Sequence, residues 1–332
     1  MKSTRHCHAS VPGPLRTITK PLPVRIGFSR VWLPAFALNL AACGLLCGQV
    51  DDFNDGNDDG WQRYDPIAQS GLGSVATYSF PSNSTYRIET SRSPAPGVVG
   101  PGRAGALRTQ VSYSNFYLSV DIIDWDPTLN QAFGLMARLD DIGLGATDGY
   151  AFTYDASNGD LDLTAFLNED PDDGEIPASG VDNIQLVRGT HYRMIFIGVG
   201  QDLTGAIYEL PNVDEPIAQI MGVNNQYGSG FVGLINYDNS GNGAGRTDVT
   251  YDNFAAFAGP PPRLTFEYAA DTRDLAIFWP ASATSFVLQA SPNLPATVWT
   301  NIPPPYEEFG DSKFHFEPTT GKSGLIFRLI SE

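Results

Sequence analysis

Carboxylates are the side chains in this sequence whose number and spacing could support chemistry. Cleavage of a glycosidic bond with retention needs two carboxyl groups about 5–5.5 Å apart. The densest candidate is EDPDDGE, Glu169 to Glu175, which Pro171 and Gly174 interrupt and place in a loop. The acids on expected strands, none with a Glu at a suitable spacing, are Asp121, Asp124, Asp160 and Asp162. No catalytic residue is therefore predicted, and the acidic loop is expected to be solvated.

Histidines and cysteines are too sparse for the other common hydrolytic or metal sites. After Val50 the chain contains only His191 and His315 as imidazoles, no cysteine and no Gly-x-Ser-x-Gly segment. A serine triad, a structural zinc site and a phosphate-binding Gly-Lys-Ser/Thr loop are all disfavoured.

An acidic segment, DDFNDGNDDGW, follows the start of this region and invites a calcium hypothesis. Calcium binds six to eight oxygens from carboxylates, amides and carbonyls. If the first and last strands pair, Asp52 comes beside Asp252. The predicted structural Ca²⁺ site therefore consists of Asp51, Asp52 and Asp252, and the alternative is a polar turn with local Asx hydrogen bonds.

Aromatic and planar polar side chains near the middle of the chain are candidates for sugar binding, since aromatic rings stack on the apolar faces of sugars. The candidate ligand-binding residues are Tyr117, Trp125, Arg138, Tyr150 and Tyr154. The alternative is that these side chains fill the core or cover a sheet face.

These candidates lie on segments that alternate apolar and polar residues, which is typical of β-strands with one buried face. The alternation is clearest in residues 116–122, 133–139 and 150–154. Further strands are expected at 77–80, 86–89, 104–110, 161–167, 191–199, 203–210, 230–236 and 247–258. No window has sustained helical periodicity, so an all-β, two-sheet antiparallel jelly-roll sandwich is predicted.

The prolines at 260–262 divide the chain after this sandwich, because consecutive prolines favour an extended conformation. Six further short strands are expected between residues 264 and 329. The predicted organisation is a targeting segment at 1–49, a jelly roll at 50–258, a linker at 259–262 and a small β-sandwich at 263–332.

The first 49 residues indicate export. They are basic and free of acids, and the apolar run VWLPAFALNLAACGLL has the length of a signal-peptide core. It is too short and too interrupted for a membrane-spanning helix, so no integral span is expected in the mature chain. All three cysteines, Cys7, Cys43 and Cys47, lie here. Lipidation at Cys43 and cleavage near Gly48 or Gln49 are the two alternatives, and either predicts a secreted or cell-surface protein.

The charge balance excludes one class of partner. The whole chain has 20 Lys and Arg against 37 Asp and Glu, a net charge of −17. So acidic a protein repels phosphate backbones, and nucleic-acid binding is not expected.

Three parts of the chain resemble the laminin-G-like, concanavalin-A-like jelly-roll superfamily: the opening DDFNDGNDDGW, the inner strands and the closing TDVTYDNFAAFA. The resemblance covers residues 50–258. The last 70 residues are similar to a short module that ends many exported bacterial proteins, with its Phe-Trp-Pro and Phe-Arg-Leu strands. The resemblance implies carbohydrate binding, carbohydrate cleavage or adhesion, and often a calcium ion.

Two functions from different classes follow. The first is an exported protein that binds a polysaccharide or glycoconjugate without evident catalytic residues. The alternative is a structural or adhesive surface scaffold, and a glycoside hydrolase ranks third. The first requires Trp125 and Tyr150 to be exposed in a shallow groove, and the second has them buried.

Overall fold

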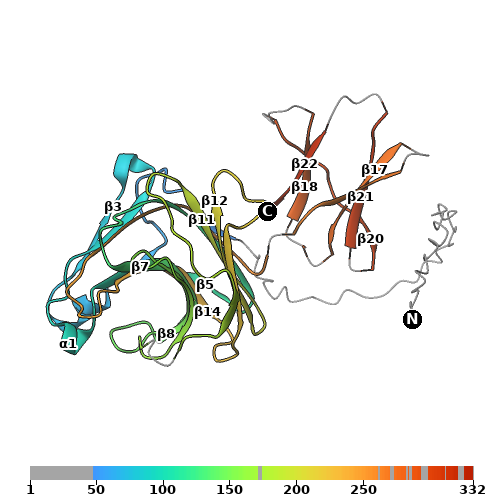
Figure 1. Cartoon of the computed structure of the whole chain (residues 1–332). Coiled ribbons are helices and arrows are strands. Elements are labelled where there is room, and N and C mark those ends of the chain that lie inside the picture. Colours follow the sequence, from blue (N-terminus) through green and yellow to red (C-terminus); the bar gives the residue numbers. More distant parts are fainter. Residues whose placement is uncertain are drawn as a thin grey trace, which may run out of the picture. The chain divides into compact units, whose positions relative to one another are not determined.

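The computed structural model describes residues 48–331, except for 171–173, 261, 270–272, 282, 284–285, 293–297, 311 and 321–324. The predicted targeting segment, with its three cysteines and the lipidation motif, lies outside the described residues apart from its last two. Within the described residues the chain is almost entirely β-structure (Figure 1), which confirms the predicted class. The helical turns described there are η1 (Pro66–Ser70), η2 (Pro81–Asn83) and the short helix α1 (Pro96–Val99). No helix in this part of the chain is long and apolar enough to cross a membrane.

A nine-stranded antiparallel sheet forms one layer of the larger domain. Its order is β10-β13-β12-β11-β6-β15-β4-β3, and β1 also pairs with β15. The bounds are β1 (Gln49–Asp51), β3 (Ala76–Ser79), β4 (Tyr86–Thr90), β6 (Phe116–Trp125), β10 (Ala178–Gly180), β11 (Tyr192–Val199), β12 (Asp202–Glu209), β13 (Ala218–Val223) and β15 (Thr247–Phe257).

A six-stranded antiparallel sheet forms the facing layer, in the order β2-β5-β14-β7-β8-β9. The bounds are β2 (Gln62–Tyr64), β5 (Arg103–Tyr113), β7 (Gln131–Asp140), β8 (Asp148–Asp155), β9 (Leu161–Phe166) and β14 (Gly230–Asp238). Figure 1 shows β7, β8 and β14 curving strongly. The two layers confirm the predicted sandwich.

One hydrophobic core joins the two layers. Phe152 of the six-stranded sheet and Phe196 of the nine-stranded sheet are fully buried, with ring centroids 6.0 Å apart. Phe116 packs against Phe196 at 4.9 Å. The alternating residues of β6, β7 and β8 supply much of this core, as their pattern predicts.

The first and last strands of the sandwich pair, as expected. In the register of β1 with β15, Asp51 lies opposite Phe254 and Gln49 opposite Ala256. The segment after β1 turns inward at Phe53, which is fully buried, and Trp61 packs edge-on against Phe254 at 4.7 Å. These contacts anchor the first segment of the sandwich to its last strand, β15.

The C-terminal part forms two smaller antiparallel sheets, which agrees with the predicted second β-structure. One has the order β16-β17-β21-β20 and the other β19-β18-β22. The bounds are β16 (Thr265–Ala269), β17 (Asp274–Pro280), β18 (Phe286–Ser291), β19 (Thr300–Asn301), β20 (Glu307–Phe309), β21 (Ser312–Pro318) and β22 (Ile326–Ser331). Ile277, Trp279 and Leu288 form its core, and Tyr306 packs edge-on against Trp279 at 4.8 Å.

Replacing Phe196 by Ala tests the shared core. We expect the free energy of unfolding to fall by about 3–5 kcal/mol, because the cavity lies between two sheets that cannot close over it. Urea unfolding measures the change. The control is Val98→Ala, whose side chain is 84% exposed and should shift stability by less than about 0.5 kcal/mol. Equal effects of the two substitutions would contradict the shared core.

Candidate functional site

A groove of about 740 Å³ lies over the face of the six-stranded sheet that is turned away from the core. Neighbouring residues of β7 lie on opposite faces of this sheet. Leu135 packs in the main core, whereas Met136 lies on the groove floor. The floor is apolar, with Met136, Ala151 and Ile235 contributed by β7, β8 and β14. The curved six-stranded sheet therefore presents a concave surface to a ligand.

Aromatic rings, hydroxyls and amides surround this floor. The half-buried rings of Phe166 and Tyr237 line the groove. The small polar side chains in the lining are Thr153, Thr164, Asn168, Asn239 and Asn242. Such a surface can contact an apolar ligand face while hydrogen bonding to its hydroxyl groups.

The side chain of Glu169 fixes one rim of the groove. It is only 7% exposed and accepts hydrogen bonds from Arg103 Nε at 2.9 Å and Arg103 Nη2 at 2.6 Å. The Tyr64 hydroxyl and the Gly145 N–H donate to the same carboxylate. The sequence-based expectation that this acidic loop is solvated is therefore wrong for Glu169.

Arg103 extends this contact to a second loop. Its Nη1 donates to the carbonyls of Val99 at 2.8 Å and Pro101 at 3.0 Å. The segment that contains α1 and the segment that contains Glu169 are thus joined through one guanidinium. Burial, followed by the nearby Glu169 carboxylate, raises the pKa of the Tyr64 hydroxyl. Tyr64 therefore stays a neutral hydrogen-bond donor to Glu169.

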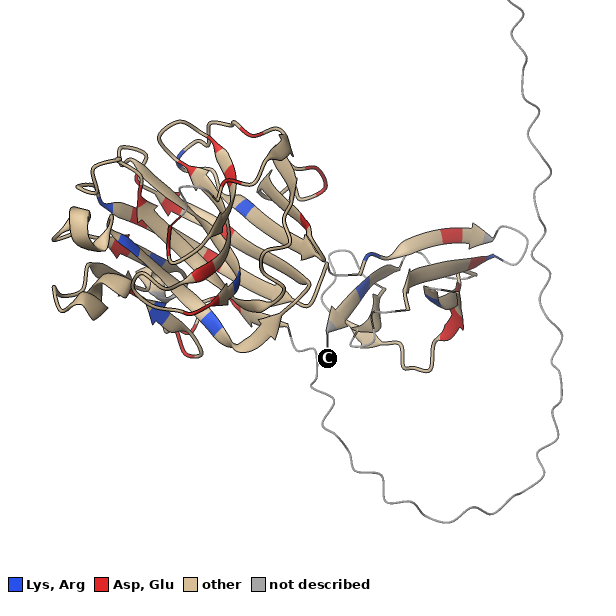
Figure 2. Ribbon diagram, turned by 90° about the horizontal axis from the view of Figure 1, so that it is seen from below, with Lys and Arg blue, Asp and Glu red and all other residues tan. Residues whose placement is uncertain are grey.

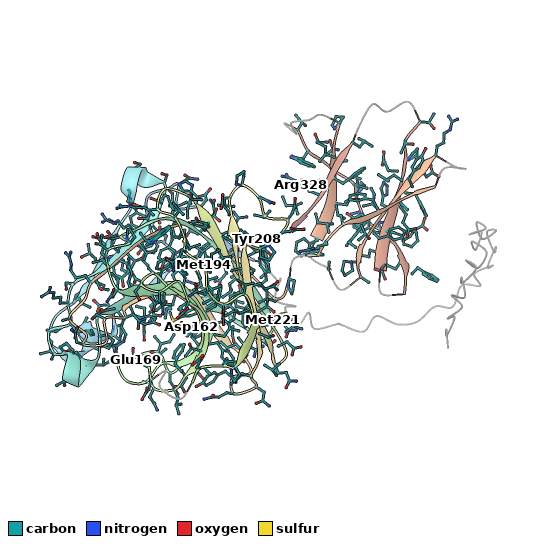
Figure 3. All side chains as sticks on the ribbon, viewed as in Figure 1. Asp162, Glu169, Met194, Tyr208, Met221 and Arg328 are labelled. Carbon is teal, nitrogen blue, oxygen red and sulfur yellow. The ribbon has the colours of Figure 1, made fainter. Side chains whose placement is uncertain are left out.

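Asp162 lies beside the groove on β9. Thr164 and Phe166 of that strand line the groove, and strand alternation puts Asp162 on the same face. Burial, and after it the carboxylates of Asp160, Glu175, Asp155 and Asp182, raise the pKa of Asp162 from 3.8 to about 6. Figure 3 labels Asp162 and Glu169 in the same part of the domain.

Four of the five aromatic and planar residues predicted to bind a ligand are buried. Trp125 is 2% exposed, Arg138 2%, Tyr150 0% and Tyr154 1%. Trp125 and Tyr150, which glycan binding on these strands requires to be exposed, are buried because both rings face the core between the sheets. The fifth, Tyr117, is half-buried on the nine-stranded sheet, packs against Phe257 and does not line the groove.

Arg138 instead holds three connecting segments together. Its guanidinium donates to the carbonyls of Ser114 at 2.9 Å, Tyr227 at 2.8 Å and Gly200 at 2.6 Å. Burial lowers the pKa of Arg138. Three carbonyl acceptors compensate part of the cost of desolvating this cation. Its role in the described contacts is structural.

One of the predicted calcium ligands, Asp51, is engaged in other contacts. Asp51 accepts hydrogen bonds from Trp61 Nε1 at 2.8 Å and the Phe53 N–H at 2.9 Å, and pairs with Arg108 at 3.2 Å. A guanidinium in this position does not fit a Ca²⁺ ligand set. Burial raises the pKa of Asp252, with Asp121 and Asp52 adding to the effect.

Among the described residues, no group of three or more His, Cys, Asp or Glu is arranged to hold a metal ion. The acidic segment is instead held by its own contacts: Asp58 pairs with Arg63 at 2.7 Å and accepts a hydrogen bond from the Tyr86 hydroxyl at 2.9 Å. Calcium binding at Asp52 and Asp252 stays a prediction.

Neither a protein-family model nor a curated protein matches the sequence. Among solved structures, the carbohydrate binding module CBM66 from Bacillus subtilis is 17% identical with a TM-score of 0.42, over 60% of this chain and 97% of that one. The lectin UEA-II complexed with galactose is 11% identical with a TM-score of 0.42, over 64% and 98%. Bacillus licheniformis beta-glucanase is 10% identical with a TM-score of 0.40, over 64% and 98%.

The substitution Glu169→Gln tests the buried ion pair with Arg103 at the rim of the groove. We expect the free energy of unfolding to fall by about 3 kcal/mol, because Arg103 is left buried without its counter-charge. The control is Asp124→Asn, which breaks a pair with Arg188 whose side chains are 47% and 55% exposed and should leave stability nearly unchanged. Urea unfolding at neutral pH compares the two, and equal losses would show that Glu169 does not act as a buried partner.

The raised pKa of Asp162 predicts a pH dependence of stability. Between about pH 4 and pH 6 the folded protein binds more protons at this residue than the unfolded chain does. This contribution to the free energy of unfolding therefore falls as the pH rises through that window and is constant above it. Asp162→Asn removes it, so the variant should gain stability relative to the wild type between pH 4 and pH 7. Thermal unfolding across this range measures the difference, and a constant difference would contradict the raised pKa.

Proposed function

We propose that this protein is exported, and binds a polysaccharide or glycoconjugate in the groove of the six-stranded sheet. The observation that carries the proposal is the groove itself, which combines an apolar floor, two half-buried rings and a set of neutral polar side chains. A secreted or cell-surface location follows from the basic, acid-free leader of the sequence.

The composition of the groove suits a sugar. A sugar ring has an apolar face that stacks on an aromatic ring, and its edge carries hydroxyls that both donate and accept hydrogen bonds. Phe166 and Tyr237 supply the rings. Thr153 and Thr164 supply hydroxyls, and Asn168 supplies an amide, for the ligand edge.

The groove is also rigid before any ligand arrives. Its floor consists of paired strands, and the Arg103–Glu169 contact ties two rim segments together. A preformed site loses little conformational freedom on binding. The hydroxyls of a sugar lose water on binding, however, so a single sugar chain should bind with a Kd of about 10 µM to 1 mM.

One observation favours the scaffold alternative. Trp125 and Tyr150 are buried, as expected for a sandwich whose aromatic residues serve the core alone. In that case the larger domain is a structural or adhesive element and the groove has no glycan partner. Hydrolysis ranks below both functions, because the Glu169 carboxylate is already engaged by Arg103, Tyr64 and Gly145.

A pair of aromatic substitutions tests whether glycan binding takes place in the groove. Phe166→Ala removes a ring from the groove and should weaken binding to a glycan found on an array by about tenfold, through the loss of stacking. Tyr117→Ala removes a half-buried ring from the other sheet and should leave binding unchanged. Isothermal titration with the full chain measures both affinities.

The possible results decide between the proposals. Loss of binding with Tyr117→Ala and not with Phe166→Ala would move the site to the nine-stranded sheet. No binding to any glycan by the wild type would support the scaffold function instead.

A further inference from the structure

The charged side chains that line the groove are mostly acidic. Among its described lining residues the cation is Arg103, and the anions are Glu169, Asp170 and Asp238. Arg103 contacts Glu169 with two hydrogen bonds, which cancels its charge locally. The lining therefore keeps at least the negative charge of Asp238, whose hydrogen-bond donors are neutral N–H groups.

Further carboxylates lie immediately beside the lining. Asp155 accepts a hydrogen bond from Asn239 Nδ2 at 2.7 Å, and Asn239 lines the groove. Asp162 lies opposite Thr153 in the register of β8 with β9, and Thr153 also lines the groove. Figure 2 shows acidic residues on strands and loops throughout the larger domain.

Two of these acids, Asp238 and Asp155, accept hydrogen bonds from neutral groups. Asp238 accepts hydrogen bonds from the N–H groups of Ser240 at 2.9 Å and Gly245 at 2.8 Å. Asp155 accepts from the amide of Asn239 and from the N–H of Ser157 at 2.8 Å. Amide donors orient these carboxylates without cancelling their charge, so the field of each reaches into the groove.

We propose that the groove selects glycans without negative charge, either neutral or amino-bearing, and rejects those that carry uronic acid or sulfate groups. The inference rests on the proposed function and specifies its ligand class. A ligand carboxylate in this groove exchanges water for an apolar floor and for neighbouring carboxylates, and both changes disfavour it.

Two groups of the protein already respond to this environment. The pKa of Asp162 is raised to about 6 by burial and then by four surrounding carboxylates. The pKa of Tyr237 is raised to about 12, chiefly by burial, with Asp162 and Asp155 adding to the effect against a hydrogen bond from Thr153. A negative charge is therefore unfavourable at two positions around the groove, one on β9 and one on β14.

The test compares one glycan backbone in two charge states. Oligogalacturonate and its fully methyl-esterified form have the same backbone and linkage and differ in the charged group. A glycan array with neutral, amino, uronic and sulfated members accompanies this pair. We expect the bound members to lack carboxylate and sulfate, and the methyl ester to bind at least about tenfold more tightly than the acid at low salt.

Variants connect the selectivity to the groove. Asp162→Asn should reduce the preference for the ester by about threefold at neutral pH. The matched control is Asp214→Asn, an exposed acid between β12 and β13 that removes the same charge far from the lining and should leave the preference unchanged.

The outcomes separate this inference from the proposed function. Equal or tighter binding of the acid form, or an array dominated by uronic or sulfated members, would overturn the charge selectivity while leaving glycan binding in place. A wild-type protein that binds no member of the array would overturn both. A preference that responds equally to Asp214→Asn would show that overall charge, and not the groove, is responsible.

Discussion

The groove depends on one buried ion pair, Arg103 with Glu169. The two residues lie 66 positions apart in the sequence, and their contact brings the segment before β5 against the segment after β9. A buried ion pair adds little net stability, because desolvation offsets most of the Coulomb attraction. It does impose geometry, since a guanidinium and a carboxylate with two shared hydrogen bonds have few alternative arrangements. The shape of the rim follows from that contact.

The six-stranded sheet packs against the core with one face and forms the groove floor with the other. Leu135 and Phe152 face the core, where packing against Phe196 holds the two layers together. Met136 and Ala151, on the same strands, face the groove. A sheet with two mostly apolar faces is unusual for an exposed surface of an antiparallel sandwich. This second apolar face is what distinguishes the groove from a simply solvated sheet surface.

Much of the fold could be predicted from alternation, and the site could not. In β8, Tyr150, Phe152 and Tyr154 share one phase, and the phase alone does not say whether it faces a core or a ligand. In β7, Ala132, Gly134 and Met136 are as apolar as the residues that face the core, so the groove side has no polar signal before Arg138. The alternation does not indicate the strand β13, because Gly222 and the short length of the strand weaken the pattern.

The role of Glu169 was hidden for a different reason. Its partners Tyr64, Arg103 and Gly145 come from three separate segments, and its backbone adopts a positive φ of 63° that no local pattern indicates. The local sequence around Glu169 contains a cluster of acids, which is typical of a solvated loop. Long-range partners of this kind become visible only when the strands are placed in register.

The most direct measurement is the position of a bound neutral oligosaccharide, from a crystal structure or from NMR shift mapping of the complex. We expect the sugar to lie over Met136 and Ala151, with a ring against Phe166 or Tyr237. The Arg103–Glu169 contact should be unchanged from the free protein. A sugar bound on the nine-stranded sheet beside Tyr117, or at a site in the C-terminal sheets alone, would contradict it.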